Sequence, residues 1–134
     1  YAAYISEKLK KPMVYIRKKP KGFGINKQIE GDFHKNQSAL LVEDLATDGG
    51  SKITFINAMR EAELKVKDIF VIFYYDIFDF KKSDLFKLNI KIHSLCTWKN
   101  IIEYIEKNNL YTEKEILDLK IFLSNPNKWR ENNG

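Results

Sequence analysis

The stretch from Ala39 to Ser51 constrains the fold more than any other part of the chain. It begins with the apolar run Ala-Leu-Leu-Val, a pattern typical of a strand that is buried on both faces of a parallel sheet. The carboxylates of Glu43 and Asp44 follow directly, and Thr-Asp-Gly-Gly-Ser precedes a stretch with helical periodicity. Because ligands of open α/β sheets bind at the carboxyl ends of strands, we expect a ligand site here.

The acidic pair and the loop after it favour different parts of one ligand. Adjacent carboxylates suit a vicinal diol, because each can accept a hydrogen bond from a hydroxyl group. The loop can direct backbone N–H groups at a phosphate, and Gly49 and Gly50 allow a close approach because they have no Cβ. A sugar phosphate carries both groups and is the ligand that we expect. The alternative is an ordinary strand-to-helix turn, for which Asp and Gly are also typical.

The residue order excludes two common phosphate-binding motifs. A nucleotide-triphosphatase loop requires Gly-Lys-Ser/Thr, whereas this chain has Gly50-Ser51-Lys52. The dinucleotide-binding pattern G-x-G-x-x-G does not occur in the sequence. The anion loop is therefore of another kind.

Positive charge is concentrated near the amino terminus. From Lys8 to Lys27 there are eight Lys or Arg residues and no Asp or Glu, in a chain of net charge +5. Pro20, Gly22 and Gly24 indicate a loop, which suits closure over a polyphosphate. Nucleic-acid-binding surfaces usually combine basic residues with aromatic or groove-reading side chains, and the mixed charges that follow this segment also argue against a nucleic-acid partner.

The length and composition of the chain indicate the broad class of protein to which it belongs. A chain of 134 residues with 44% hydrophobic and 31% charged residues is typical of a single globular domain. No apolar run approaches the length of a membrane span and no signal-peptide pattern is present, so we expect a cytoplasmic protein without a membrane partner. The single cysteine, Cys96, cannot form an internal disulfide and is expected to be reduced.

Periodicity predicts the remaining elements. The amino-terminal residues have helical spacing, and Thr97 and Thr112 are expected to cap two helices near the carboxyl terminus. Trp98 and Trp129 are expected to be packing residues. The expected strands are residues 13–16, 39–42, 67–75 and 90–94, with a turn or edge strand at 29–32. Strands that alternate with helices predict an α/β fold with a mainly parallel sheet.

Residues 43–51 resemble the phosphoribosyl pyrophosphate (PRPP) signature of the type I phosphoribosyltransferases. Residues 17–24 and 28–31 are similar to the mobile catalytic loop of the orotate phosphoribosyltransferases. The resemblance continues through residues 70–78 and 93–95, so it covers essentially the whole chain. It implies a type I phosphoribosyltransferase-like α/β core in which a mainly parallel central sheet is flanked by helices.

This resemblance also implies the domain organisation of the chain. We expect residues 1–134 to form a single phosphoribosyltransferase core domain. We also expect the chain to be a fragment that lacks the amino-terminal segment of the complete enzyme, in which case the fragment alone could be inactive.

The implied reaction is transfer of the 5-phosphoribosyl group from PRPP to orotate, which gives orotidine 5'-monophosphate and pyrophosphate in pyrimidine synthesis. Its ribosyl centre resembles an oxocarbenium ion, so catalysis depends on positioning the sugar and stabilising the leaving pyrophosphate. Mg²⁺ is the implied cofactor, held mainly by substrate and water and by no dedicated protein ligand. The implied partners are PRPP, a pyrimidine base and a second copy of the chain, in a homodimer whose basic loop reaches the neighbouring site.

The family pattern implies a role for each part of the site. Glu43 and Asp44 hold the ribose hydroxyls, the loop after them binds the 5-phosphate, and Lys21 assists the departure of pyrophosphate. Lys21 and Asp44 are thus the expected catalytic residues. The expected substrate-binding residues are Arg17, Lys18, Lys21, Glu43, Asp44, Leu45, Ala46, Thr47, Asp48, Gly49, Gly50 and Ser51.

Three departures from the family pattern leave the accepted base open. Phe23 occupies a loop position that is often His in orotate enzymes. The Arg that many members use to hold the orotate carboxylate is absent, and Tyr74, Tyr75 and Asp76 stand in its place. Asp48 adds a carboxylate to the phosphate loop, and we expect its side chain to point outward. The alternatives are a phosphoribosyltransferase for another base and a non-catalytic sugar-phosphate-binding domain.

Overall fold

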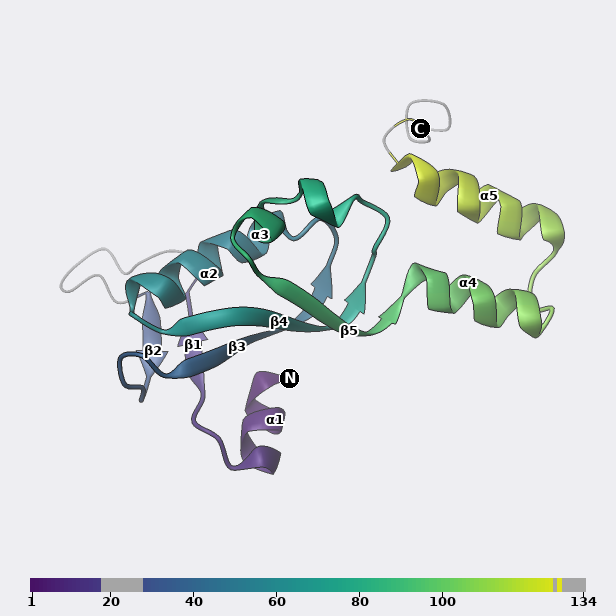
Figure 1. The fold of residues 1–134 in the computed structure, drawn as a ribbon. Coiled ribbons are helices and arrows are strands. Elements are labelled where there is room, and N and C mark those ends of the chain that lie inside the picture. Colours follow the sequence, from purple (N-terminus) through teal and green to yellow (C-terminus); the bar gives the residue numbers. More distant parts are fainter. Residues whose placement is uncertain (18–27, 127, 129–134) are drawn as a thin grey trace.

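A computed structural model describes residues 1–17, 28–126 and 128 of the chain (Figure 1). Its centre is a three-stranded parallel sheet in the order β3-β4-β5. The strands are β3 (Ser38–Ala46), β4 (Lys65–Tyr74) and β5 (Lys91–Thr97). A separate antiparallel pair consists of β1 (Val14–Ile16) and β2 (Ile29–Gly31). The prediction of an α/β fold with a mainly parallel sheet is confirmed.

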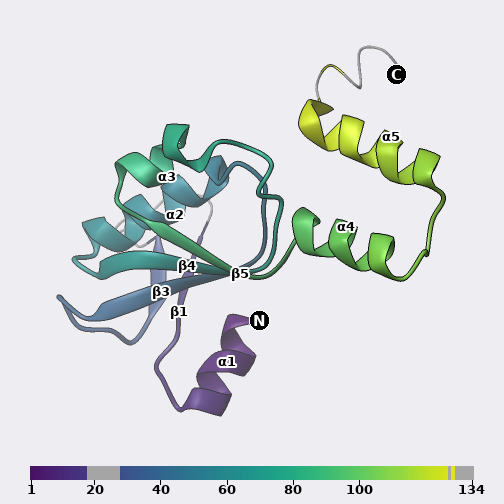
Figure 2. The ribbon, with the colours of Figure 1, turned by 45° about the vertical axis from the view of Figure 1, so that its right-hand side comes forward.

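Helices cover the two faces of the central sheet unequally. The helix α2 (Gly50–Glu61) lies on one face, with the short helix α3 (Asp84–Lys87) and the 3-10 turn η1 (Phe80–Lys82) beside it (Figure 1). The helix α1 (Ala2–Leu9) lies on the opposite side. The helices α4 (Trp98–Lys107) and α5 (Glu113–Ser124) extend away from the sheet beyond the carboxyl end of β5 (Figure 2). In the part of the chain that the structure describes, no helix has the length and apolar character needed to cross a membrane.

The hydrophobic core lies between α2 and the central sheet. Ile56 and Met59 of α2 are 0% and 1% exposed, and Ile69 and Val71 of β4 are fully buried. The spacing of the two helix residues puts both on the face that contacts the sheet. Each such side chain stabilises the fold by about 1.5–3 kcal/mol through burial of apolar surface. This core anchors α2 and therefore the loop that precedes it.

The strand β3 differs from its prediction in length and burial. It continues to Ala46, so Glu43 and Asp44 lie within the strand and not after its end. The prediction that the apolar run is buried on both faces is wrong: Leu41 is 8% exposed on the core side, whereas Leu40 is 51% exposed. The reason is that helix packing covers one face of this strand much more fully than the other.

The first strand also differs from the prediction. We expected a buried strand at residues 13–16, and β1 does form there, but it pairs with β2 and not with the central sheet. Tyr15 is consequently 58% exposed and Met13 is 41% exposed. The prediction of an edge strand near residues 29–32 is confirmed by β2.

Local sequence signals determine the helix boundaries near the carboxyl terminus. Thr97 and Thr112 each form a capping box, in which the side chain of the third helical residue bonds back to the cap. Ser83 caps α3 by accepting a hydrogen bond from the backbone N–H of Phe86. Both predicted threonine caps are confirmed, because capping depends on residues only a few positions apart.

Candidate active site

The acidic pair lies in the second half of β3, beside the amino-terminal end of α2. Glu43 extends toward α2, where its Oε2 atom lies 2.9 Å from Nζ of Lys52. The Oδ1 atom of Asp44 accepts a hydrogen bond of 2.7 Å from the backbone N–H of Leu45. Each carboxylate thus has one oxygen engaged, and its second oxygen can accept a hydrogen bond from a ligand.

One cavity of about 570 Å³ brings the acidic pair together with the following loop. Such a volume is in the range of small-molecule sites. The residues that line it are Glu43, Asp44, Leu45, Thr47, Ser51, Lys52, Thr54 and Phe55. The hydroxyl groups of Thr47 and Ser51 therefore share a cavity with the two carboxylates. This is the combination that a phosphorylated sugar requires.

The two glycines of the loop have different structural roles. Gly49 is buried and has a φ of 82°, a conformation that L-residues adopt at a cost. A Cβ at this position would collide with Cδ1 of the fully buried Leu85. Gly50 begins α2, and its Cβ would lie 3.5 Å or more from its nearest neighbours, which are atoms of the Asp48 carboxylate. Gly49 is thus required by the fold, whereas Gly50 has space for a side chain.

Asp48 is exposed and is not among the residues that line the cavity, but its side chain bonds to the backbone of the loop itself. Its Oδ1 atom accepts a hydrogen bond of 2.9 Å from the backbone N–H of Gly50. The physical reason is that the first N–H groups of a helix have no partner within the helix and attract a nearby carboxylate. One of the backbone donors that we expected to bind phosphate is therefore already bonded to a side chain of the protein.

Lys52 is a site residue that sequence reasoning missed. It is 6% exposed and lies in the first turn of α2. The sequence does contain a pattern that points to this residue. The spacing of one helix face relates Lys52 to Ile56 and Met59, and the last two belong to the core. A buried lysine on an apolar stripe requires an anionic partner, and the partly buried Glu43 is that partner.

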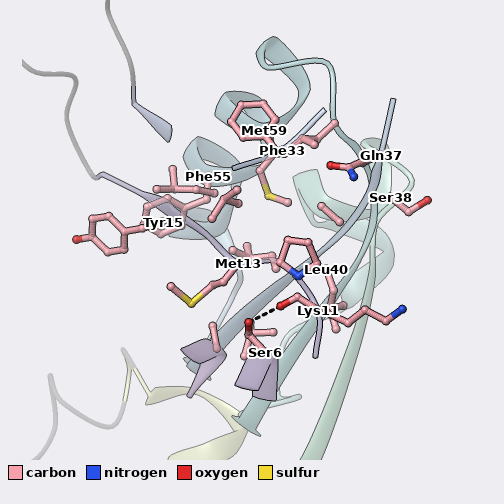
Figure 3. Close-up of a pocket in the computed structure, with 18 of the residues that line it drawn as sticks. Ser6, Lys11, Met13, Tyr15, Phe33, Gln37, Ser38, Leu40, Phe55 and Met59 are labelled. Atoms are coloured by element: carbon pink, nitrogen blue, oxygen red, sulfur yellow. Dashed lines mark hydrogen bonds between the residues drawn. The ribbon is translucent and has the colours of Figure 1, made fainter. Parts of the chain in front are cut away.

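A second cavity of about 550 Å³ lies between the amino-terminal elements and β3 (Figure 3). Among the residues that line it are the apolar Met13, Phe33 and Leu40, which are labelled in Figure 3. Glu43 and Phe55 line both cavities, so the two spaces adjoin at these side chains. The first cavity contains the polar groups expected for a sugar phosphate, whereas the second is mainly apolar.

Comparison with known proteins identifies relatives along the whole chain, although no protein-family model matches it. Orotate phosphoribosyltransferase from Roseobacter denitrificans is 43% identical over 133 residues, which are 99% of this chain and 59% of the relative. The enzyme of the same name from Sinorhizobium fredii is 39% identical over 134 residues, which are 100% of this chain and 58% of the relative. The chain is similar throughout to orotate phosphoribosyltransferases. The chain spans less than two thirds of the length of these relatives.

Solved structures agree with this relationship. UMP synthase from Leishmania donovani matches with a TM-score of 0.71 and 26% identity, over 91% of this chain and 26% of that protein. Orotate phosphoribosyltransferase from Aeropyrum pernix matches with a TM-score of 0.63 and 27% identity, over 78% of this chain and 56% of that protein. The resemblance inferred from the sequence, including the type I phosphoribosyltransferase-like fold, is confirmed.

The basic segment expected in an orotate phosphoribosyltransferase is described only at its start. Arg17 follows β1, and its Nε donates a hydrogen bond of 2.7 Å to Oε1 of Glu30. Arg17 is not among the residues that line the cavity of the acidic pair. The expected loop residues Lys18, Lys21 and Phe23 lie outside the described residues, as does Trp129.

The positions where orotate phosphoribosyltransferases often have an Arg lie at the end of β4. The pKa of Tyr74 is raised by burial and, to a smaller extent, by the nearby carboxylates of Asp76 and Asp48. Tyr75 contacts Trp98 edge to face, with ring centroids 5.9 Å apart. The predicted packing role of Trp98 is therefore confirmed. Neither tyrosine is among the residues that line the cavity of the acidic pair, and Asp76 adds a carboxylate beside them, so these three positions supply no guanidinium group.

Two further residues of the predicted set, Leu45 and Ala46, are the last two residues of β3. Ala46 is 2% exposed, and its carbonyl oxygen accepts a hydrogen bond from the backbone N–H of Tyr75. Within the described residues, no group of three or more His, Cys, Asp or Glu side chains is placed to hold a metal ion. Any cation at this site would therefore depend on the acidic pair and on oxygen atoms of a ligand.

Proposed function

We propose that this chain forms the PRPP-binding core of an orotate phosphoribosyltransferase. The reaction transfers the 5-phosphoribosyl group of PRPP to orotate and releases pyrophosphate, giving orotidine 5'-monophosphate for pyrimidine synthesis. The observation that carries the proposal is the single cavity that joins Glu43 and Asp44 to the hydroxyl groups of Thr47 and Ser51. The similarity of the whole chain to orotate phosphoribosyltransferases supports the same reaction.

In this proposal the two halves of the cavity bind the two halves of the sugar phosphate. The ribose hydroxyls donate hydrogen bonds to the second oxygens of Glu43 and Asp44. The 5-phosphate accepts hydrogen bonds from the hydroxyls of Thr47 and Ser51 and from backbone N–H groups at the start of α2. Because Asp48 already accepts from one of these N–H groups, the phosphate must displace its carboxylate or bind beside it.

The acidic pair also suits the chemistry of the transferred group. Positive charge develops on the ribosyl centre as the bond to pyrophosphate breaks, and two carboxylates held beside the ribose stabilise that charge. Their fixed positions also orient the sugar, so that the base nitrogen can attack in the correct direction. Asp44 is the proposed catalytic member of the pair, because it is the more exposed of the two carboxylates.

Mg²⁺ fits the donor set of this cavity. Glu43 and Asp44 supply carboxylate oxygens, which this cation prefers, and they could hold it through water while their second oxygens accept hydrogen bonds from the ribose. When bound beside the pyrophosphate, the cation would neutralise part of the charge of the leaving group.

Other parts of the proposal rest on the sequence. Lys21 stays our candidate for assisting the departure of pyrophosphate, with Lys18 as a further pyrophosphate ligand. Arg17 could join them only by exchanging its partner Glu30 for the ligand. We further propose that residues 1–134 form a single core domain, that the protein is a cytoplasmic homodimer, and that its basic loop reaches the site of the neighbouring subunit.

Calorimetric titration of the chain with PRPP and Mg²⁺ tests the proposal. Asp44→Asn and Glu43→Gln each remove one negative acceptor and should weaken binding roughly 10- to 100-fold, the effect of losing one charge-assisted hydrogen bond. Asp118→Asn is the matched control, because it removes the same charge from an exposed position on α5. Equal affinities for the wild type and the Asp44→Asn variant would contradict the proposed site.

A further inference from the structure

Lys52 occupies a position that is unfavourable for a lysine in two respects. It is 6% exposed, and burial of an ammonium group is costly unless a partner compensates for the lost hydration. It also lies in the first turn of α2, where the helix dipole disfavours positive charge. Both penalties are offset at one place, the contact of 2.9 Å between Lys52 Nζ and Glu43 Oε2. The burial of Lys52 beside Glu43 therefore calls for an explanation beyond the local sequence.

The pair is part of the wall of the candidate active site. Lys52 and Glu43 both line the cavity that contains the hydroxyls of Thr47 and Ser51. The side chain of Glu43 is 24% exposed, whereas that of Lys52 is 8% exposed. The lysine thus lies behind the carboxylate, and the carboxylate is the member of the pair that a ligand can reach.

A glutamate side chain has three rotatable bonds, so an unrestrained Glu43 would lose conformational entropy each time it bound a ligand. The bond from Lys52 engages Oε2 in advance. Among the described residues, no hydrogen bond or ion pair to Oε1 is found for Glu43, so this oxygen can accept from a ligand. Asp44, with a shorter side chain, is restrained by its own bond to the backbone N–H of Leu45.

We propose that Lys52 is a positioning residue for Glu43. It holds Oε2 so that Oε1 faces the cavity and accepts a hydrogen bond from a ribose hydroxyl. This inference rests on the proposed function, because it assigns the ribose of PRPP to Glu43. It differs from two simpler roles for Lys52, which are a purely structural ion pair and a direct ligand of the phosphate.

The test compares two ligands that differ in the ribose alone. Affinities for ribose 5-phosphate and for inorganic phosphate are measured by calorimetry, and their ratio reports the contribution of the sugar. Lys52→Met should lower this ratio about tenfold, as expected for one hydrogen bond to a charged acceptor. Lys67→Met is the control, because it removes the same charge from an exposed position of β4 and should leave the ratio unchanged.

A double-mutant cycle with Glu43→Gln separates positioning from the other roles. If Lys52 acts through Glu43, the Glu43→Gln/Lys52→Met variant should show the same ratio as Glu43→Gln alone. This variant removes the charge of both members of the pair, so neither is left buried without its partner, and it provides a second folded background if Lys52→Met is unstable. Folding of every variant is checked by circular dichroism.

Each other outcome overturns the inference in a different way. Equal loss of affinity for both ligands in the Lys52→Met variant would make Lys52 a phosphate ligand. Unchanged affinities with a lower melting temperature would make the pair purely structural. Failure of the wild type to bind either ligand would overturn the proposed function, and the inference with it, whereas normal binding by wild type and Lys52→Met alike would overturn the inference alone.

Discussion

The adjacent glycines of the phosphate loop should respond in opposite ways to the same substitution. Gly49→Ala places a Cβ at a residue with a φ of 82°, directed at Cδ1 of Leu85. Leu85 is 0% exposed and belongs to the core cluster, so it cannot move aside without disturbing its neighbours. Gly50→Ala places a Cβ at the start of α2, where the atoms around it are at ordinary contact distance.

The expected magnitudes follow from these two environments. The left-handed conformation costs an L-residue about 1–2 kcal/mol, and overpacking of a core costs about 1–3 kcal/mol, so Gly49→Ala should destabilise the fold by about 3 kcal/mol. For a domain of this size, this loss corresponds to a melting temperature lower by roughly 10 °C. Gly50→Ala should be neutral or stabilising by up to about 1 kcal/mol, because alanine favours helix more than glycine does.

Thermal and urea unfolding, followed by far-ultraviolet circular dichroism, measure both variants against the wild type. The two substitutions add the same methyl group at neighbouring positions, so each is the control for the other. Equal destabilisation by Gly49→Ala and Gly50→Ala would show that the loop does not have the backbone conformation described here. A Gly49→Ala variant within about 0.5 kcal/mol of the wild type would refute the argument from Leu85, because that value is the usual limit for surface substitutions.

Two further predictions concern the carboxyl-terminal half. The pKa of Glu115 is lowered by its hydrogen bonds with Thr112, so its contribution to stability is present above its ordinary pKa of 4.5 and is lost as pH falls through the lower folded value. Thr112→Ala should destabilise the protein by about 1 kcal/mol and should reduce the stability that is lost on acidification. Urea unfolding at pH 6 and pH 3 measures both effects. If the variant lost as much stability between pH 6 and pH 3 as the wild type, the effect of Thr112 on Glu115 would be contradicted. Trp98→Phe should change stability by less than about 1 kcal/mol, because the phenyl ring still packs beside Phe73. The substitution also removes a buried N–H that has no hydrogen-bond partner among the described residues. A larger loss of stability in thermal unfolding would contradict this prediction.

Features that depend on neighbouring residues could be predicted from the sequence. The threonine caps at 97 and 112 need only a side chain three positions away, and both form. The helix after Ser51 follows from apolar spacing, and the parallel sheet follows from the alternation of strands with helices. The cavity that joins Glu43 and Asp44 to Thr47 and Ser51 could also be predicted, because strand, loop and helix follow each other without interruption.

Features that depend on distant partners could not be predicted in the same way. The apolar run at residues 13–16 predicts a strand but does not specify the sheet that it joins, and β1 pairs with β2. The run at residues 39–42 predicts burial, but the exposure of Leu40 depends on how completely other elements cover that face. The ion pair of Arg17 with Glu30 exists because antiparallel pairing of β1 and β2 brings these residues together across the loop.

The environment of Lys52 could be predicted in part. Its position on the apolar stripe of α2 can be read from the spacing to Ile56 and Met59, and a lysine there requires an anion. The sequence does not identify that anion, because Glu43, Asp44 and Asp48 all precede the helix within ten residues. The structure distinguishes them: Asp44 bonds to the backbone N–H of Leu45, Asp48 bonds to that of Gly50, and Glu43 alone of the three pairs with Lys52 among the described residues. Because the three carboxylates have three different partners, substitutions at Glu43, Asp44 and Asp48 should have separable effects on ribose and phosphate binding.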